Sequence, residues 1–188
     1  MTLFEYLSIA VSIVLSLVLL RLVAGLRAIA GSPGRHWLPI CWAALLLGVS
    51  LAHWWTSWSF RGADWTFATF VLMLAGPAIL YLAATALVPD NTDEVDDWRT
   101  HFFKRRVQFF SALCAYAVIS AVDGYLILDA PLLVQARLGQ IALLALAVLG
   151  LSTEKERIHT VIAGTFALLF FGVMFTLMDV PDSIVQKP

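Results

Sequence analysis

The chain has 188 residues, of which 61% are hydrophobic and 13% charged, and its mean hydropathy is +0.86. A water-soluble domain of this length needs more polar residues to cover its surface, so this composition excludes an ordinary soluble protein and predicts an integral membrane protein. The net charge of −1 and the lack of a basic patch give no indication of nucleic-acid binding.

Six apolar stretches account for nearly the whole chain. A helix needs about 20 apolar residues to cross the hydrocarbon core of a bilayer, and it satisfies its backbone polar groups internally. We therefore predict an all-α bundle of six transmembrane helices that forms one domain over residues 1–188. The helices are expected at 3–24, 37–58, 65–88, 107–128, 132–151 and 158–178.

The basic residues gather on one side of the predicted helices. Nine Lys and Arg residues lie in or beside the loops after the first, third and fifth helices, whereas the opposite side has Arg61, Arg137 and Lys187. By the positive-inside rule the richer side is cytoplasmic, which predicts a bacterial inner-membrane protein with both termini in the periplasm. The nine residues are Arg21, Arg27, Arg35, Arg99, Lys104, Arg105, Arg106, Lys155 and Arg157.

The longest predicted loop, 89–106, begins with an acidic run and ends with a basic one. Val95, Trp98 and Phe102 recur within it at helical spacing, which is typical of a short amphipathic helix lying on the inner leaflet. A solvated loop anchored by Trp98 is the alternative, and an element that docks a partner is a third interpretation. An aromatic belt at the opposite interface is expected at Trp54, Trp55, Trp58 and Trp65.

Small residues mark faces on which helices can approach one another closely. Ala44, Gly48 and Ala52 are spaced by four in the second predicted helix, and Gly172 lies on a small-residue face of the last one. Small residues at this spacing are typical of helix packing in lipid. We predict that these faces pack within the subunit or between subunits, so that the protein forms a homo-oligomer or joins a larger membrane complex.

A polar stripe runs along the first predicted helix. Glu5, Ser8, Ser12 and Ser16 fall within an arc of about 80°, at about 100° per residue. Such serines can bond back to the preceding turn or pack as small residues. They can also line a track for water or ions, and this second interpretation remains open.

Ionisable residues are expensive inside a membrane, so each one is a hypothesis for function. Glu5, His53, Asp123, Arg137 and Gln140 are all expected near the outer ends of their helices. Together they can form a proton relay, a cation site or an anion site. Their alternative role is structural, since Arg137 can extend to the interface or pair with a carboxylate.

Motifs for catalysis or cofactor binding are missing from the sequence. It contains no nucleophile elbow, no HExxH and no Cys/His spacing typical of zinc. Haem held by two histidines needs both at one depth, but His53 is near the outer side while His36, His101 and His159 are near the inner side. We therefore predict no catalytic residue, no metal and no cofactor, and no enzymatic activity.

The leading hypothesis is a small channel or secondary transporter for an ion or small solute. Its pathway would use Glu5, His53 and Asp123, with Arg137 adjusting the local charge and the serine stripe continuing inward. A non-catalytic membrane subunit or scaffold of a larger complex is the alternative, and an electron-transfer subunit is a third. The sequence alone does not separate these three classes.

Overall fold

The computed structural model describes residues 3–127 and 135–178, with side chains for 3–127 and 139–175. All regular secondary structure in this part of the chain is helical, which confirms the predicted all-α fold. Two short 3₁₀ helices, η1 (Ser57–Gly62) and η2 (Thr92–Glu94), accompany the α-helices. The α-helices are α1 (Leu3–Gly31), α2 (Trp37–Thr56), α3 (Phe67–Leu87), α4 (Trp98–Leu126), α5 (Gln135–Ser152) and α6 (Glu156–Met178).

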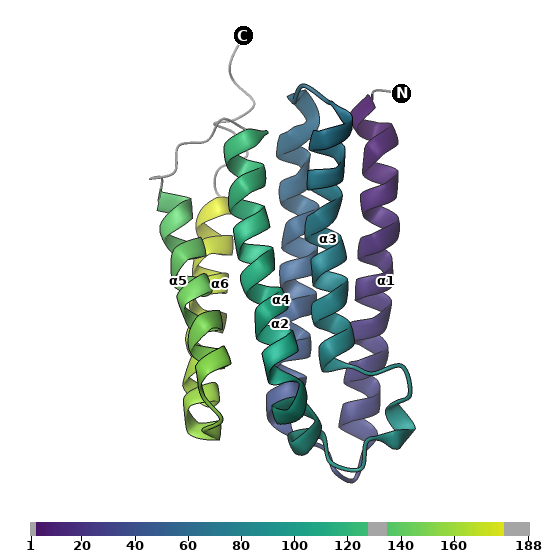
Figure 1. Ribbon diagram of the computed structural model, residues 1–188, viewed down its shortest axis with the longest axis vertical. Helices are drawn as coiled ribbons and strands as arrows, with labels where there is room; N and C mark the ends of the chain where they lie inside the picture. The colour runs from purple at the N-terminus through teal and green to yellow at the C-terminus, as the bar shows by residue number, and fades with distance from the viewer. Residues whose placement is uncertain (1–2, 128–134, 179–188) are drawn as a thin grey trace.

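Successive helices run in opposite directions, so α1 begins and α6 ends at the same end of the bundle (Figure 1). Four helices form a closed ring, because α2 packs against α4, α4 against α5, α5 against α6, and α6 against α2. The remaining two, α1 and α3, pack against each other and against α2 outside this ring, and α3 also packs against α4. We call the first set the four-helix ring.

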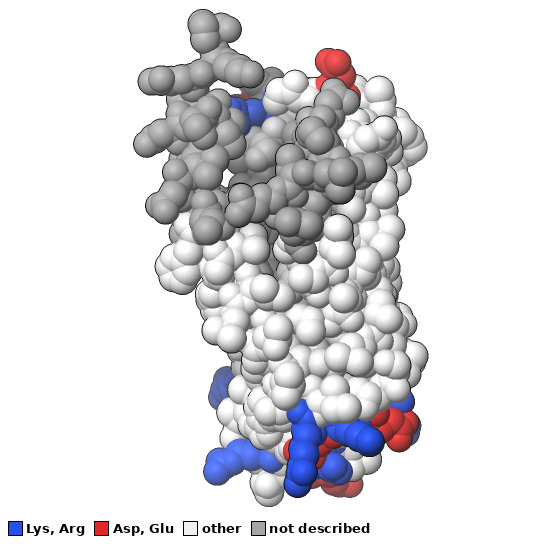
Figure 2. Space-filling view, turned by 90° about the vertical axis from the view of Figure 1, so that its left-hand side faces the viewer, with Lys and Arg blue, Asp and Glu red and all other residues white. Residues whose placement is uncertain are grey.

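The bundle is embedded in a membrane. Five of its helices are long and apolar enough to cross one, and the apolar part described for α5, Gly139–Ser152, is shorter. Five of the six predicted spans are therefore confirmed by length and composition. Lys, Arg, Asp and Glu side chains gather at the end where α1 finishes, and a wide uncharged band lies above them on the face shown in Figure 2.

The predicted loop over 89–106 is wrong in its second half. The helix α4 begins at Trp98 and continues through Lys104 and Arg106 into the membrane-spanning part without a break. Trp98 and Phe102 are each only 1% exposed, so they face the bundle interior and not the lipid surface. The backbone N–H of Trp98 donates to the carbonyl of Gly34, 3.1 Å away, and this bond ties the start of α4 to the turn that follows α1.

Asp97 caps the N-terminus of α4. Its carboxylate accepts hydrogen bonds from the backbone N–H groups of Arg99 and Thr100, both at 3.1 Å, and from the Thr100 hydroxyl. The first two satisfy donors that have no partner within the helix. The hydrogen bond from the Thr100 hydroxyl is the main reason why the pKa of Asp97 lies below its usual value.

We expect Asp97→Ala to lower the unfolding temperature at neutral pH, because two N–H groups of α4 lose their acceptor. A carboxyl group whose pKa is lower in the folded protein stabilises the fold at pH values above its pKa in the unfolded chain. This contribution is lost as the pH falls through its pKa in the folded protein. The difference between wild type and Asp97→Ala should therefore shrink at acidic pH. Asp96→Ala, which changes an exposed neighbour, is the control for thermal unfolding followed across pH. An effect of Asp97→Ala that is equal at all pH values would contradict this role.

Aromatic side chains fill the four-helix ring on the side nearer the charged end. The Trp42 ring meets Phe109, Phe110 and Phe166 edge-on, with centroids 5.3, 5.2 and 5.3 Å apart. Such edge-to-face contacts are favourable because the ring edges are positive and the faces negative. We call these four residues the aromatic plug. On the charged side of the plug, His159 is fully buried, and its ring contacts Phe110.

Polar contacts at the charged end connect loops that are distant in sequence. Glu156 at the start of α6 accepts from Arg99 of α4 at 2.7 Å and lies 3.1 Å from Nε2 of His36. Because Nδ1 of His36 accepts the backbone N–H of Leu38, its Nε2 is the donor to Glu156. The guanidinium of Arg106 donates to the carbonyl of Thr153 and pairs with Glu154. These contacts hold the plug end of the ring together.

Candidate functional site: a cavity inside the four-helix ring

A cavity of about 190 Å³ lies inside the four-helix ring. It occupies the half of the ring away from the charged end, because its lining comes from 49–56 of α2, 113–120 of α4, 139–147 of α5 and 166–174 of α6. The aromatic plug borders it through Phe166, which belongs to both. Its lining residues are Val49, Ala52, His53, Thr56, Leu113, Tyr116, Ala117, Ser120, Gly139, Gln140, Leu143, Ala147, Phe166, Phe170, Val173 and Met174.

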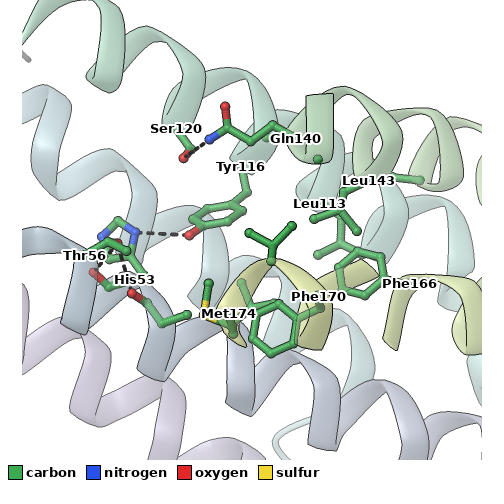
Figure 3. Close-up of a pocket in the computed structure, with 16 residues that line it drawn as sticks. His53, Thr56, Leu113, Tyr116, Ser120, Gln140, Leu143, Phe166, Phe170 and Met174 are labelled. Carbon is green, nitrogen blue, oxygen red and sulfur yellow. Dashed lines mark hydrogen bonds between the residues drawn. The ribbon is translucent and has the colours of Figure 1, made fainter. Parts of the chain in front are cut away.

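One wall of the cavity is polar. Nδ1 of His53 on α2 lies 3.1 Å from the hydroxyl oxygen of Tyr116 on α4 (Figure 3). One turn further along α4, the Ser120 hydroxyl accepts a hydrogen bond from Nε2 of Gln140 at 3.1 Å. The hydroxyl of Thr56 donates to the carbonyl of Ala52 at 2.9 Å. Three helices thus contribute hydroxyl, amide and imidazole groups to this wall.

The other wall is apolar. Phe166, Phe170 and Met174 come from α6, whose lining side chains are all apolar, and Leu113 and Leu143 lie one turn nearer the aromatic plug than Tyr116 and Gln140 on the same helices (Figure 3). Phe170 is positioned by Gly48 of α2, because a Cβ at Gly48 would lie 3.1 Å from the ring. The cavity is therefore amphipathic, with hydrogen-bonding groups on one side and hydrocarbon on the other.

A glycine of α3 makes room for the His53 ring. A Cβ at Gly76 would lie 2.8 Å from Cε1 of His53, closer than side chains tolerate. His53 is only 8% exposed, and its Nε2 has no hydrogen-bond partner among the described residues. A buried N–H without a partner is rarer than a buried acceptor without one, so we assign the proton to Nδ1. Nδ1–H then donates to the Tyr116 oxygen, and the Tyr116 O–H remains available as a donor.

Two of the predicted pathway residues, His53 and Gln140, line the cavity. Asp123 is only 3% exposed and lies on α4 seven positions after Tyr116, but it does not line the cavity. Its Oδ1 has no hydrogen-bond partner within the described part of the chain. The side chain of Arg137 lies outside the described residues.

The polar stripe on α1, formed by Glu5, Ser8, Ser12 and Ser16, does not line the cavity. Ser8 donates to the carbonyl of Glu5 at 2.8 Å, and Ser16 donates to the carbonyl of Ser12 at 2.7 Å. Ser12 accepts from the Trp54 indole at 3.4 Å, and the Glu5 side chain is exposed. These four residues are separated from the cavity because α1 lies outside the four-helix ring. Ser8 and Ser16 therefore bond back to the preceding turn, which is the first of the two roles considered for this stripe.

The predicted packing residues have different surroundings. Gly48 contacts Phe170, Ala52 lines the cavity, and Ala44 is exposed. Gly172 is also exposed, and a Cβ there would meet nothing within 4 Å. Of the aromatic belt, Trp54, Trp55 and Trp58 are more than half exposed.

The hydroxyl groups of the polar wall were not among the residues predicted from the sequence. Tyr116 and Ser120 are four positions apart, with Asp123 three further on, so all three lie on one face of α4. This spacing is a signal that the sequence contains.

Among the described residues, no group of three His, Cys, Asp or Glu side chains is arranged to hold a metal ion. The chain matches no protein-family model, no curated protein and no solved structure.

Proposed function

We propose that this protein is a small membrane transport protein, a channel or secondary transporter, whose solute passes along the axis of the four-helix ring. The observation that carries this proposal is the amphipathic cavity lined by α2, α4, α5 and α6. A pathway through a membrane needs such an interior volume with polar groups, because lipid offers a solute no hydrogen bonds.

The aromatic plug blocks the proposed pathway, so the structure corresponds to a closed state. Trp42 is 1% exposed and its three aromatic neighbours lie within 5.3 Å between centroids, so no solute passes between them. Passage requires the plug to separate, for example when the α5–α6 pair moves relative to α2 and α4. Alternating access by movement of helix groups around a central site is common among transporters.

The positive-inside rule supports placing the charged end in the cytoplasm. The cavity then lies in the outer half of a bacterial inner membrane, and both termini face the periplasm. In this orientation the cavity is the outward-facing part of the pathway, and the plug is its inner gate.

The test is a flux assay in liposomes that contain the purified protein. Stopped-flow light scattering follows the entry of uncharged solutes, and a potential-sensitive dye follows K⁺ and H⁺. We expect protein-dependent flux of at least one of these species, and at least a tenfold loss of that flux in Ala52→Leu, which fills the cavity. Ala44→Leu adds the same volume to the same helix at an exposed position and should leave flux unchanged.

Two results would overturn the proposal. One is the absence of protein-dependent flux for every species in the panel. The other is an equal flux in the Ala52→Leu and Ala44→Leu proteins, since the pathway would then not pass through the cavity.

A further inference from the structure

We infer that the cavity accepts a small uncharged solute with hydroxyl groups along one side of a three- or four-carbon chain. This inference rests on the proposed transport function and names the substrate class of the same cavity. It depends on three properties of the cavity, which are its charge, its two walls and its volume.

No Lys, Arg, Asp or Glu is among the described residues that line the cavity. An ion that enters it would lose its hydration shell without gaining an opposite charge, and burying an unpaired charge is costly. The closest acidic group on the same face of α4 is Asp123, which is buried but does not line the cavity. An uncharged solute has no such desolvation penalty.

The polar wall offers both donors and acceptors. With the proton of His53 on Nδ1, the Tyr116 O–H is free to donate, and the Ser120 O–H can donate while its oxygen accepts from Gln140. Residues four apart on a helix place their Cβ atoms about 5–6 Å apart, so Tyr116 and Ser120 lie on one face of α4. A hydroxyl group both donates and accepts, so neighbouring hydroxyls of one solute can satisfy both positions.

The apolar wall matches the carbon side of the same solute. Phe166, Phe170 and Met174 of α6 present hydrocarbon, and a C–H surface packs there without breaking any hydrogen bond. A purely apolar solute would leave the polar wall without partners, which costs free energy. A solute that carries hydroxyl groups on every side would place some of them against hydrocarbon. The two walls together favour a solute with one polar and one apolar side.

The volume limits the size of the solute. An apolar cavity of about 150 Å³ in another protein holds one benzene molecule. The cavity of about 190 Å³ has room for a three- or four-carbon polyol of similar size. A six-carbon linear polyol has about twice as many heavy atoms as benzene, so we expect this volume to exclude it.

The experiment measures solute entry into proteoliposomes by stopped-flow light scattering, with glycerol, erythritol and sorbitol as the probes. We expect glycerol and erythritol to enter at least about tenfold faster than into protein-free liposomes, and sorbitol to enter no faster. Tyr116→Phe removes one hydroxyl from the polar wall, and glycerol entry should fall about three- to tenfold, the factor typical of one lost hydrogen bond. Tyr125→Phe makes the same change at an exposed position of α4 and should have no effect.

The outcomes separate the substrate class from the proposed function. If K⁺ or H⁺ crosses in a cavity-dependent way while glycerol and erythritol enter at the protein-free rate, the substrate class is wrong and transport stands. If sorbitol enters as fast as glycerol, the size limit is wrong. Equal glycerol entry through the folded Tyr116→Phe and Tyr125→Phe proteins would overturn the role of the polar wall.

Discussion

The Gly34→Ala protein is expected to unfold at a much lower temperature than wild type, with a loss of about 1–3 kcal/mol in the free energy of unfolding. The reason is the backbone that faces this glycine. A Cβ at Gly34 would overlap the carbonyl oxygen of Asp96 and lie 3.0 Å from its carbonyl carbon. Backbone atoms cannot rotate away as a flexible side chain can, so one of the two loops must shift.

A shift there also affects α4. The carbonyl of Gly34 accepts the N–H of Trp98, and the Asp97 cap directly precedes this residue. Gly31→Ala is the matched control, because it lies at the end of α1 in the same connection and its Cβ would meet nothing within 4 Å. Thermal unfolding in detergent, followed by Trp fluorescence, compares the two. Equal unfolding temperatures for Gly34→Ala and Gly31→Ala would contradict the close packing of these loops.

The second large effect is expected for Trp42→Ala, which should lose about 3–5 kcal/mol of stability and also make the closed state leak. Helix association in lipid depends on van der Waals packing, and Trp42 is the shared contact of three aromatic rings from α4 and α6. Its removal leaves a gap between the cavity and the charged end. If the plug is the inner gate, glycerol should then enter proteoliposomes faster than it does through wild type, because the lining of the cavity is unchanged while its inner exit is open.

Trp37→Ala is the control for this variant, because Trp37 lies in the same helix and is 45% exposed. It should retain nearly wild-type stability and the same closed state. A Trp42→Ala protein that folds and admits glycerol no faster than Trp37→Ala would remove the plug from the proposed pathway.

Hydrophobicity alone predicted the membrane bundle well, because a long apolar helix in lipid has few alternatives. The first helix was predicted to end at residue 24 but continues to Gly31, whereas the start of α2 at Trp37 was predicted correctly. The start of α4 was not, because a run of charged residues between Trp98 and Val107 resembles a surface loop. In the structure Trp98 and Phe102 anchor that run against the interior, and the charged side chains extend from the helix at the membrane edge.

The site was only partly predictable for a different reason. Sequence position gives the depth of a residue in the membrane, but it does not give the order of the helices around the bundle. Glu5 and His53 were grouped by depth, yet α1 lies outside the four-helix ring and α2 belongs to it. The pairing of His53 with Tyr116 depends on how α2 and α4 pack, and on Gly76 of α3, none of which a linear pattern contains.

The most direct test of a solute pathway through the four-helix ring is the reactivity of one cysteine toward a small membrane-impermeant thiol reagent. Ala117→Cys places it in the lining of the cavity, and Ala115→Cys places it two residues away at an exposed, lipid-facing position of α4. Both are made in a protein whose Cys41 and Cys114 are replaced by serine. We expect Ala117→Cys to react when the reagent is added from the periplasmic side, and Ala115→Cys to stay unreactive. If Ala117→Cys is as inert as Ala115→Cys, the cavity is closed to water and is not part of a pathway.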